Sequence, residues 1–126
     1  MKILVTDDMK GWRDFNSTVM YELFGENIIV DTAESAFEGY NKVLENNNEP
    51  YDIILTDLQM EEDYAPKLAG EWLVEQIKTL SNYYKTKIVM ISASYNIRHI
   101  ADNLGVECIP KSAARVSLEA YKQVLL

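Results

Sequence analysis

Five short apolar runs recur along the chain. They lie at Ile3–Val5, Ile28–Val30, Ile53–Leu55, Ile88–Ile91 and Val106–Ile109. Each run has the length of a strand, and most are rich in β-branched residues. Runs without polar alternation are typical of parallel strands that are covered on both faces.

Apolar residues at helical spacing fill the stretches between these runs. The stripes extend from Trp12 to Leu23, Phe37 to Leu44, Leu73 to Leu80, Ile97 to Leu104 and Ala113 to Val124. Core packing accounts for all of them. Five repeats of a strand followed by a helix predict an α/β fold, with a parallel sheet, helices on both of its faces and right-handed crossovers. The 126 residues fit one domain, 1–126.

The composition narrows the classes of function. Hydrophobic residues make up 48% of the chain, but the apolar stretches are too short to cross a bilayer. The chain begins without a secretory signal, and a single cysteine, Cys108, excludes an internal disulfide, so we expect a cytoplasmic protein. A net charge of −8 repels duplex DNA, so we expect no direct nucleic-acid partner. Because the apolar stretches are strand-sized, we expect no membrane partner either.

Polar residues follow four of the five apolar runs. They are Thr6-Asp7-Asp8, Thr56-Asp57, Ser92-Ala93-Ser94 and Lys111. Ligands of open parallel sheets bind beyond the carboxyl ends of the strands. The pattern therefore predicts three carboxylates, a hydroxyl group and an ammonium group at one edge of the sheet.

This set of groups suits phosphoryl chemistry. Three close carboxylates repel one another, and Mg²⁺ would relieve that repulsion. One carboxylate could then attack phosphorus and form an acyl phosphate, while the lysine and the hydroxyl bind the phosphoryl oxygens. Taken singly, an aspartate here could be a helix cap, Ser92 a loop hydroxyl and Lys111 a solvated cation. Their joint occurrence at four strand ends favours a site.

These residues resemble the receiver domain of two-component response regulators, the CheY-like family. The resemblance spans essentially all 126 residues. It is carried by Asp7-Asp8, by Asp57 within ILTDLQM, by Ser92-Ala93 and by Lys111. It implies a flavodoxin-like, doubly wound (βα)5 fold with five parallel strands in the order 2-1-3-4-5.

The resemblance also implies a role for each matching residue. Asp57 would be the phosphorylation site, and Lys111 would pair with it before phosphorylation. Ser92 would be the switch hydroxyl and would contact the phosphoryl group. After phosphorylation, Lys111 would pair with a phosphoryl oxygen. The ligands of Mg²⁺ (or Mn²⁺) would be Asp7, Asp8, Asp57 and the backbone carbonyl of Gln59. The residues that tune the lifetime of the phosphoryl group would be Gln59, Ala93 and Ser94.

The implied partners are proteins. A histidine kinase or phosphotransfer protein would donate the phosphoryl group. A downstream protein would bind the face made by the fourth helix, the fifth strand and the fifth helix. The chain would not be an enzyme, beyond weak self-phosphorylation from small donors and self-dephosphorylation.

The chain departs from the family pattern in four places. Cys108 stands where the family has an aromatic switch residue, with Tyr95 as an alternative aromatic. Ser112 follows the lysine where proline is usual, and the proline is at Pro110. The loop at residues 61–69 is long. It opens with three acids, Glu61-Glu62-Asp63, which we interpret as solvated. The alternative is that one of them reaches the cation or shapes kinase specificity.

Three other functions compete with this one. An aspartate-nucleophile phosphatase needs a second carboxylate two residues after the nucleophile, where this chain has Gln59. A flavin-binding electron carrier needs a hydroxyl- or glycine-rich loop after the first strand, where this chain has the charged segment DDMKGW. A degenerate receiver would act as a phosphorylation-independent interaction module. The altered switch position, Cys108, keeps that last alternative open.

Overall fold

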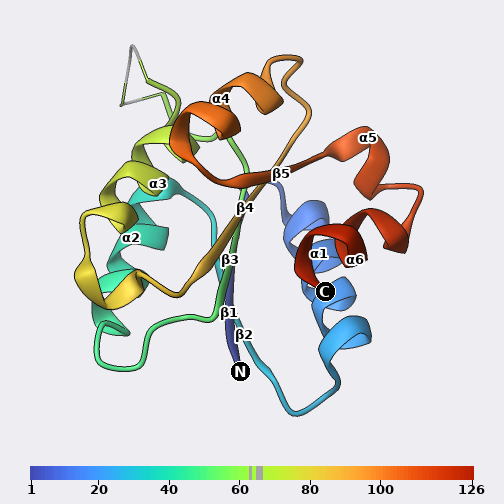
Figure 1. The fold of residues 1–126 in the computed structure, drawn as a ribbon, viewed down its shortest axis with the longest axis horizontal. Helices are drawn as coiled ribbons and strands as arrows, with labels where there is room; N and C mark the ends of the chain where they lie inside the picture. Colours follow the sequence, from blue (N-terminus) through green and yellow to red (C-terminus); the bar gives the residue numbers. More distant parts are fainter. Residues whose placement is uncertain (63, 65–66) are drawn as a thin grey trace.

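A five-stranded parallel sheet forms the centre of the molecule. The computed structural model describes residues 1–62, 64 and 67–126. The strands are β1 (Lys2–Thr6), β2 (Ile29–Ala33), β3 (Ile53–Thr56), β4 (Lys87–Ser92) and β5 (Glu107–Pro110). Their order across the sheet is β2-β1-β3-β4-β5 (Figure 1). The predicted strand order and flavodoxin-like topology are confirmed.

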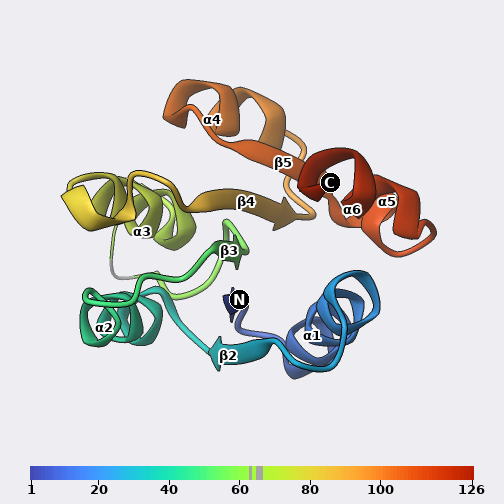
Figure 2. The same cartoon turned by 60° about the horizontal axis from the view of Figure 1, so that its bottom comes forward.

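Helices cover both faces of this sheet, as predicted. They are α1 (Lys10–Phe24), α2 (Ala36–Glu45), α3 (Ala69–Lys78), α4 (Ile97–Leu104), α5 (Lys111–Ala114) and α6 (Leu118–Leu125), with a short 3-10 helix, η1 (Ser81–Tyr83), before β4. Helices α1, α5 and α6 lie on one face, and α2, α3 and α4 lie on the other (Figure 2). None of the helices in the described part of the chain is long and apolar enough to cross a membrane.

The central strands are apolar throughout because they meet a core on each side. Successive side chains of a strand point to opposite faces. Leu4 packs with Leu73 and Ile77 of α3, whereas its neighbour Val5 packs with Tyr121 of α6 on the other face. All five side chains are at most 1% exposed. The continuous apolar runs in the sequence therefore reflect two separate cores.

The prediction of one helix from Ala113 to Val124 is wrong. Two helices occupy this segment, and the extended backbone of Ser117 separates them. The Ser117 hydroxyl accepts a hydrogen bond of 3.1 Å from the Glu119 N–H, so this residue caps α6. Helix α5 is a single short turn. It begins at Lys111, which follows the last residue of β5 directly and therefore lies at the carboxyl edge of the sheet.

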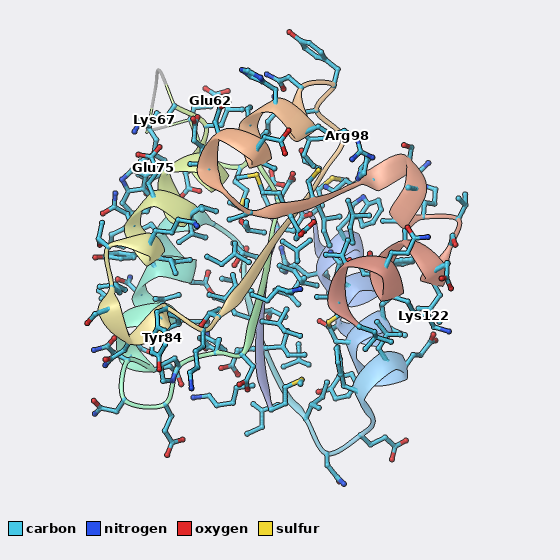
Figure 3. The ribbon with its side chains drawn as sticks, viewed as in Figure 1. Glu62, Lys67, Glu75, Tyr84, Arg98 and Lys122 are labelled. Atoms are coloured by element: carbon cyan, nitrogen blue, oxygen red, sulfur yellow. The ribbon has the colours of Figure 1, made fainter. Side chains whose placement is uncertain are left out.

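The start of α3 is locked against the end of β3. The Gly70 N–H donates to the carbonyl oxygen of Leu58 at 2.9 Å, and a Cβ at Gly70 would lie 2.0 Å from the carbonyl oxygen of Asp57. Only glycine allows this approach. Lys67, three residues before this glycine, forms an ion pair with Glu75 of α3, and the two side chains lie side by side in Figure 3.

We predict that Gly70→Ala lowers the free energy of unfolding by about 3 kcal/mol, because the new methyl group must displace the backbone of Asp57. Gly11→Ala is the matched control. It lies in exposed space within α1 and meets no atom within 4 Å. The control should stabilise the protein by about 1 kcal/mol through helix propensity. Urea unfolding of both variants measures the difference, and equal effects would contradict the close-approach argument.

Candidate functional site

The site lies where β1 and β3 end, toward the top of Figure 1. The sheet's hydrogen bonding continues one residue past both strands. The Asp57 N–H donates to the Thr6 carbonyl at 2.9 Å, and the Asp7 N–H donates to the Ala33 carbonyl at 3.1 Å. Asp7 and Asp57 therefore lie side by side, each directly after the end of one of the neighbouring strands β1 and β3. Together with the exposed Asp8 they bring three carboxylates to one place, with one oxygen of each within 4.8 Å of the others.

Lys111 reaches this cluster from the start of α5. Its Nζ lies 3.0 Å from Oδ2 of Asp7 and 3.2 Å from Oδ2 of Asp57. Ser92 pairs with Pro110 in the sheet, so Lys111, the residue after Pro110, enters the site from the end of β5. The lysine is only 6% exposed. Two carboxylates supply the counter-charge that a buried ammonium group requires.

Backbone amides orient the two buried carboxylates. Oδ1 of Asp57 accepts from the Leu58 N–H at 2.7 Å, and Oδ1 of Asp7 accepts from the Met9 N–H at 2.9 Å. These bonds turn each Oδ2 toward Lys111. Oδ2 of Asp7 is within ion-pair distance of the ammonium group but receives no well-directed hydrogen bond from the described residues.

One ammonium group leaves the three carboxylates undercompensated. Burial raises the pKa of Asp7 above its ordinary value of 3.8, and the charge of Asp57 raises it further, although the Met9 N–H and Lys111 act in the opposite direction. An additional cation would relieve this cost. Carboxylate oxygens around a partly open position are the ligands that Mg²⁺ takes, so the donor set fits a hard divalent cation.

The predicted switch and tuning residues lie around the same edge. Ser92 is 1% exposed, and its hydroxyl accepts from the Ser94 N–H at 3.3 Å. Ser92, Ala93, Ser94 and Lys111 line one cleft. Ala93 is exposed, and so is Gln59, two residues beyond Asp57.

Two residues at the site were not found from the sequence. The Trp12 ring, which the sequence indicated only as core packing, has its centroid 4.9 Å from the Nζ of Lys111. Nη1 of Arg13 donates to the backbone carbonyl of Asp7 at 2.9 Å. Both contacts depend on how α1 lies beside β1. The only available signal was their closeness in sequence to the acidic pair.

One of the three acids in the loop, Glu61, is not placed as predicted. The interpretation of Glu61 as a solvated residue is wrong, because its two carboxylate oxygens accept from the N–H groups of Ala36 at 2.6 Å and Phe37 at 3.2 Å. Glu61 thereby caps the N-terminus of α2, where negative charge is favourable. Glu62 is exposed, and Asp63 lies outside the described residues.

The two candidates for an aromatic switch position also have definite places. Cys108 is half-buried against the core under α2, α3 and α4, and burial raises the pKa of its thiol. This environment disfavours the reactive thiolate. Tyr95 is 99% exposed, so its ring does not pack into the molecule in this structure.

We predict that Glu61→Gln lowers the free energy of unfolding by about 1 kcal/mol, because the charge at the N-terminus of α2 and one acceptor are lost. Its affinity for Mg²⁺ should change less than about twofold, since both carboxylate oxygens already serve α2. Glu62→Gln is the control and should leave stability within about 0.5 kcal/mol of the parent. Urea unfolding and titration calorimetry measure the two quantities. A large loss of Mg²⁺ affinity in Glu61→Gln alone would contradict the capping role.

We also predict a pH-dependent gain of stability in Asp7→Asn. The pKa of Asp7 is higher in the folded than in the unfolded state, so the folded state binds more protons in the window above pH 3.8. The contribution of Asp7 to stability therefore falls as pH rises through that window. The stability advantage of Asp7→Asn should grow with pH and then level off.

Urea unfolding at a series of pH values above 3.8, without divalent cations, measures the difference in stability between Asp7→Asn and the parent. Asp102→Asn, at an exposed carboxylate of α4, is the control and should show little pH-dependent difference. An advantage of Asp7→Asn that shrinks as pH rises would contradict the assigned cause.

Known proteins resemble this chain in structure. No family model matches the sequence, and no curated protein sequence matches it. The chemotaxis response regulator CheY4 of Vibrio cholerae superposes with a TM-score of 0.75 at 22% identity, over 98% of each chain. A CheY-like response regulator receiver domain protein of Methanospirillum hungatei JF-1 superposes with a TM-score of 0.70 at 25% identity, over 97% of this chain and 90% of the other.

A third match is the signal receiver domain of a DNA-binding response regulator of Colwellia psychrerythraea 34H. Its TM-score is 0.72 at 18% identity, over 99% of this chain and 98% of the other. The matches extend over nearly the whole of both partners, and all three are receiver domains or a response regulator of that size. The chain therefore has the CheY-like receiver fold of response regulators.

Proposed function

We propose that residues 1–126 form one phosphoacceptor receiver domain and that Asp57 accepts the phosphoryl group. The observation that carries the proposal is the contact of Lys111 with Asp57, 3.2 Å apart and buried, beside two further carboxylates. An aspartate used only as a structural ion-pair partner needs no such excess of acid. A phosphoryl acceptor that works with a divalent cation does.

Asp7, Asp8, Asp57 and the backbone carbonyl of Gln59 would hold Mg²⁺ or Mn²⁺. When bound, the cation offsets the negative charge of the phosphoryl oxygens and of the carboxylates around them. The spacing of the three carboxylates, with one oxygen of each within 4.8 Å of the others, supports this assignment. Their surplus charge after pairing with one lysine gives the physical reason.

In the proposed transfer, a carboxylate oxygen of Asp57 attacks the phosphorus of a phosphohistidine. The new bond joins that oxygen to phosphorus, and the bond from phosphorus to the histidine nitrogen breaks. The phosphohistidine ring already carries a proton on its other nitrogen, so the departing nitrogen keeps the electron pair and the imidazole leaves as a neutral ring. Lys111 and Ser92 bind phosphoryl oxygens, while the exposed Ala93 leaves room beside them. Gln59 and Ser94 would tune the lifetime of the phosphoryl group.

The donor would be a histidine kinase or a phosphotransfer protein. Downstream signalling would pass to a protein that binds the face formed by α4, β5 and the predicted fifth helix, which the structure divides into α5 and α6. Lys111 supports this choice of face because it contacts Asp57 and is also the first residue of α5. A change of charge at Asp57 acts on this residue first. In this proposal the chain accepts and carries the phosphoryl group and does not act as an enzyme on other molecules.

We predict that acetyl phosphate with Mg²⁺ adds one phosphoryl group to the protein. Chelation of Mg²⁺ should abolish the addition, and Asp57→Asn should prevent it because the acceptor oxygen is lost. Asp8→Asn should need about tenfold more Mg²⁺ for the half-maximal rate, since one carboxylate near the cation is removed. Intact-protein mass spectrometry over time measures all three effects.

Asp102→Asn is the control for these variants, because it removes an equal charge from an exposed position on α4. It should be phosphorylated like the parent. A parent protein without a mass increase, or an increase that persists in Asp57→Asn, would refute the proposed acceptor. The first outcome would favour a phosphorylation-independent interaction module.

A further inference from the structure

An aromatic ring from α1 lies against the lysine of the site. The Trp12 ring centroid is 4.9 Å from Nζ of Lys111 and 6.0 Å from Cζ of Arg115. The face of an indole ring is electron-rich and attracts cations, more strongly where water is excluded. Lys111 is 6% exposed, so its contact with the ring is largely shielded from water.

The two cations reach the ring from one turn of α5. Lys111 and Arg115 are four residues apart, and the Arg115 N–H donates to the Lys111 carbonyl at 3.0 Å. Residues four apart lie on the same side of a helix. Arg115 itself is exposed. The Trp12 ring therefore contacts both a buried cation at Asp57 and an exposed cation at the surface.

Packing holds this ring in place. Phe15 meets Trp12 edge-on, with centroids 5.4 Å apart and an interplanar angle of 68°. Phe15 in turn lies 6.4 Å from the ring of Tyr121, which is buried in α6. The indole thus belongs to the core between α1 and α6, while its face is directed at the lysine. A fixed ring restricts where the flexible ammonium group can go.

We propose that Trp12 is a positioning residue for phosphoryl transfer to Asp57. Its ring holds the ammonium group of Lys111 between Asp7 and Asp57, ready to meet a phosphoryl oxygen. When that oxygen arrives, Nζ shifts toward it and the contact with Trp12 changes. The ring therefore also reports the state of the site. This inference rests on the proposed function, because it assumes that Asp57 accepts a phosphoryl group.

Trp12 differs from the two positions considered for an aromatic switch residue. The family's aromatic switch position holds Cys108, which carries no ring, and Tyr95 is 99% exposed. Trp12 contacts Lys111 directly, and through Arg115 it extends to the groove between α1 and the start of α6. A displacement of Lys111 is thereby felt at the surface of α1 as well as at α5.

Fluorescence tests the reporting role. The chain has two tryptophans, so Trp72→Phe leaves Trp12 as the only one. In this variant, acetyl phosphate with Mg²⁺ should change the tryptophan emission with the same rate constant as the gain of mass. Trp72 packs against Tyr64 and Tyr40 on the opposite face of the sheet from Trp12, and phenylalanine keeps a ring at that position. A rate of mass gain equal to that of the parent checks that the site of this variant is intact.

Phosphorylation rates test the positioning role. Trp12→Leu should slow the gain of mass about tenfold, because a shielded cation–π contact is lost. Trp12→Phe keeps a weaker ring and should recover most of the rate, to within about threefold of the parent. Phe24→Leu is the matched control. Phe24 packs on the same core but lies at the far end of α1, about 18 Å along the helix from Trp12, so this variant should stay within about twofold of the parent.

Each outcome either supports or overturns the role proposed for Trp12. Matching fluorescence and mass kinetics, with recovery in Trp12→Phe, support the proposal. A mass gain without any change in Trp12 emission overturns it, and so do equal rates in Trp12→Leu and Phe24→Leu, which would indicate packing alone. These results leave the proposed function standing. A parent protein that gains no mass overturns the proposed function and this inference together.

Discussion

The buried contact of Lys111 with Asp7 and Asp57 is the interaction on which the rest of the site depends. An ammonium group and two carboxylates that are each at most 6% exposed are costly to hide from water. Each is tolerated because the others are present. The three groups come from the ends of β1 and β3 and from the start of α5. The contact therefore joins the inner strands β1 and β3 to the outer strand β5, which Lys111 follows. A change of charge at Asp57 alters the electrostatic energy of all three groups.

The surroundings of this contact are held from several directions. Gly70 fixes the start of α3 against the backbone of Asp57, and Glu61 joins the long loop to the N-terminus of α2. Trp12 adds the first turn of α1 beside Lys111. Three helices are thereby tied to the carboxyl edge of the sheet at points close to Asp57. These contacts surround the backbone of Asp57, and the site is open on the side of Asp8 and Ala93, which are exposed.

Much of the fold could be predicted because the apolar runs are unbroken where a strand meets two cores. The exception at the C-terminus has a physical reason. Ala113 and Ala120 are seven residues apart, which is the spacing of one face of a continuous helix, and both also pack on the same core in the interrupted segment. Periodicity alone does not reveal the break. The readable signal was Ser117, a residue type that favours the position before the first turn of a helix.

The sequence by itself determined which chemistry is possible here. Acidic, hydroxyl and ammonium groups stand at the ends of strands, and parallel strands bring those ends to one edge. Only the tertiary structure decided how the groups are used. It directs Glu61 to α2 and sets Trp12 against Lys111. The reason is that a hydrophobic pattern reports which face of an element is buried, whereas contacts between elements depend on how those elements lie against one another in space.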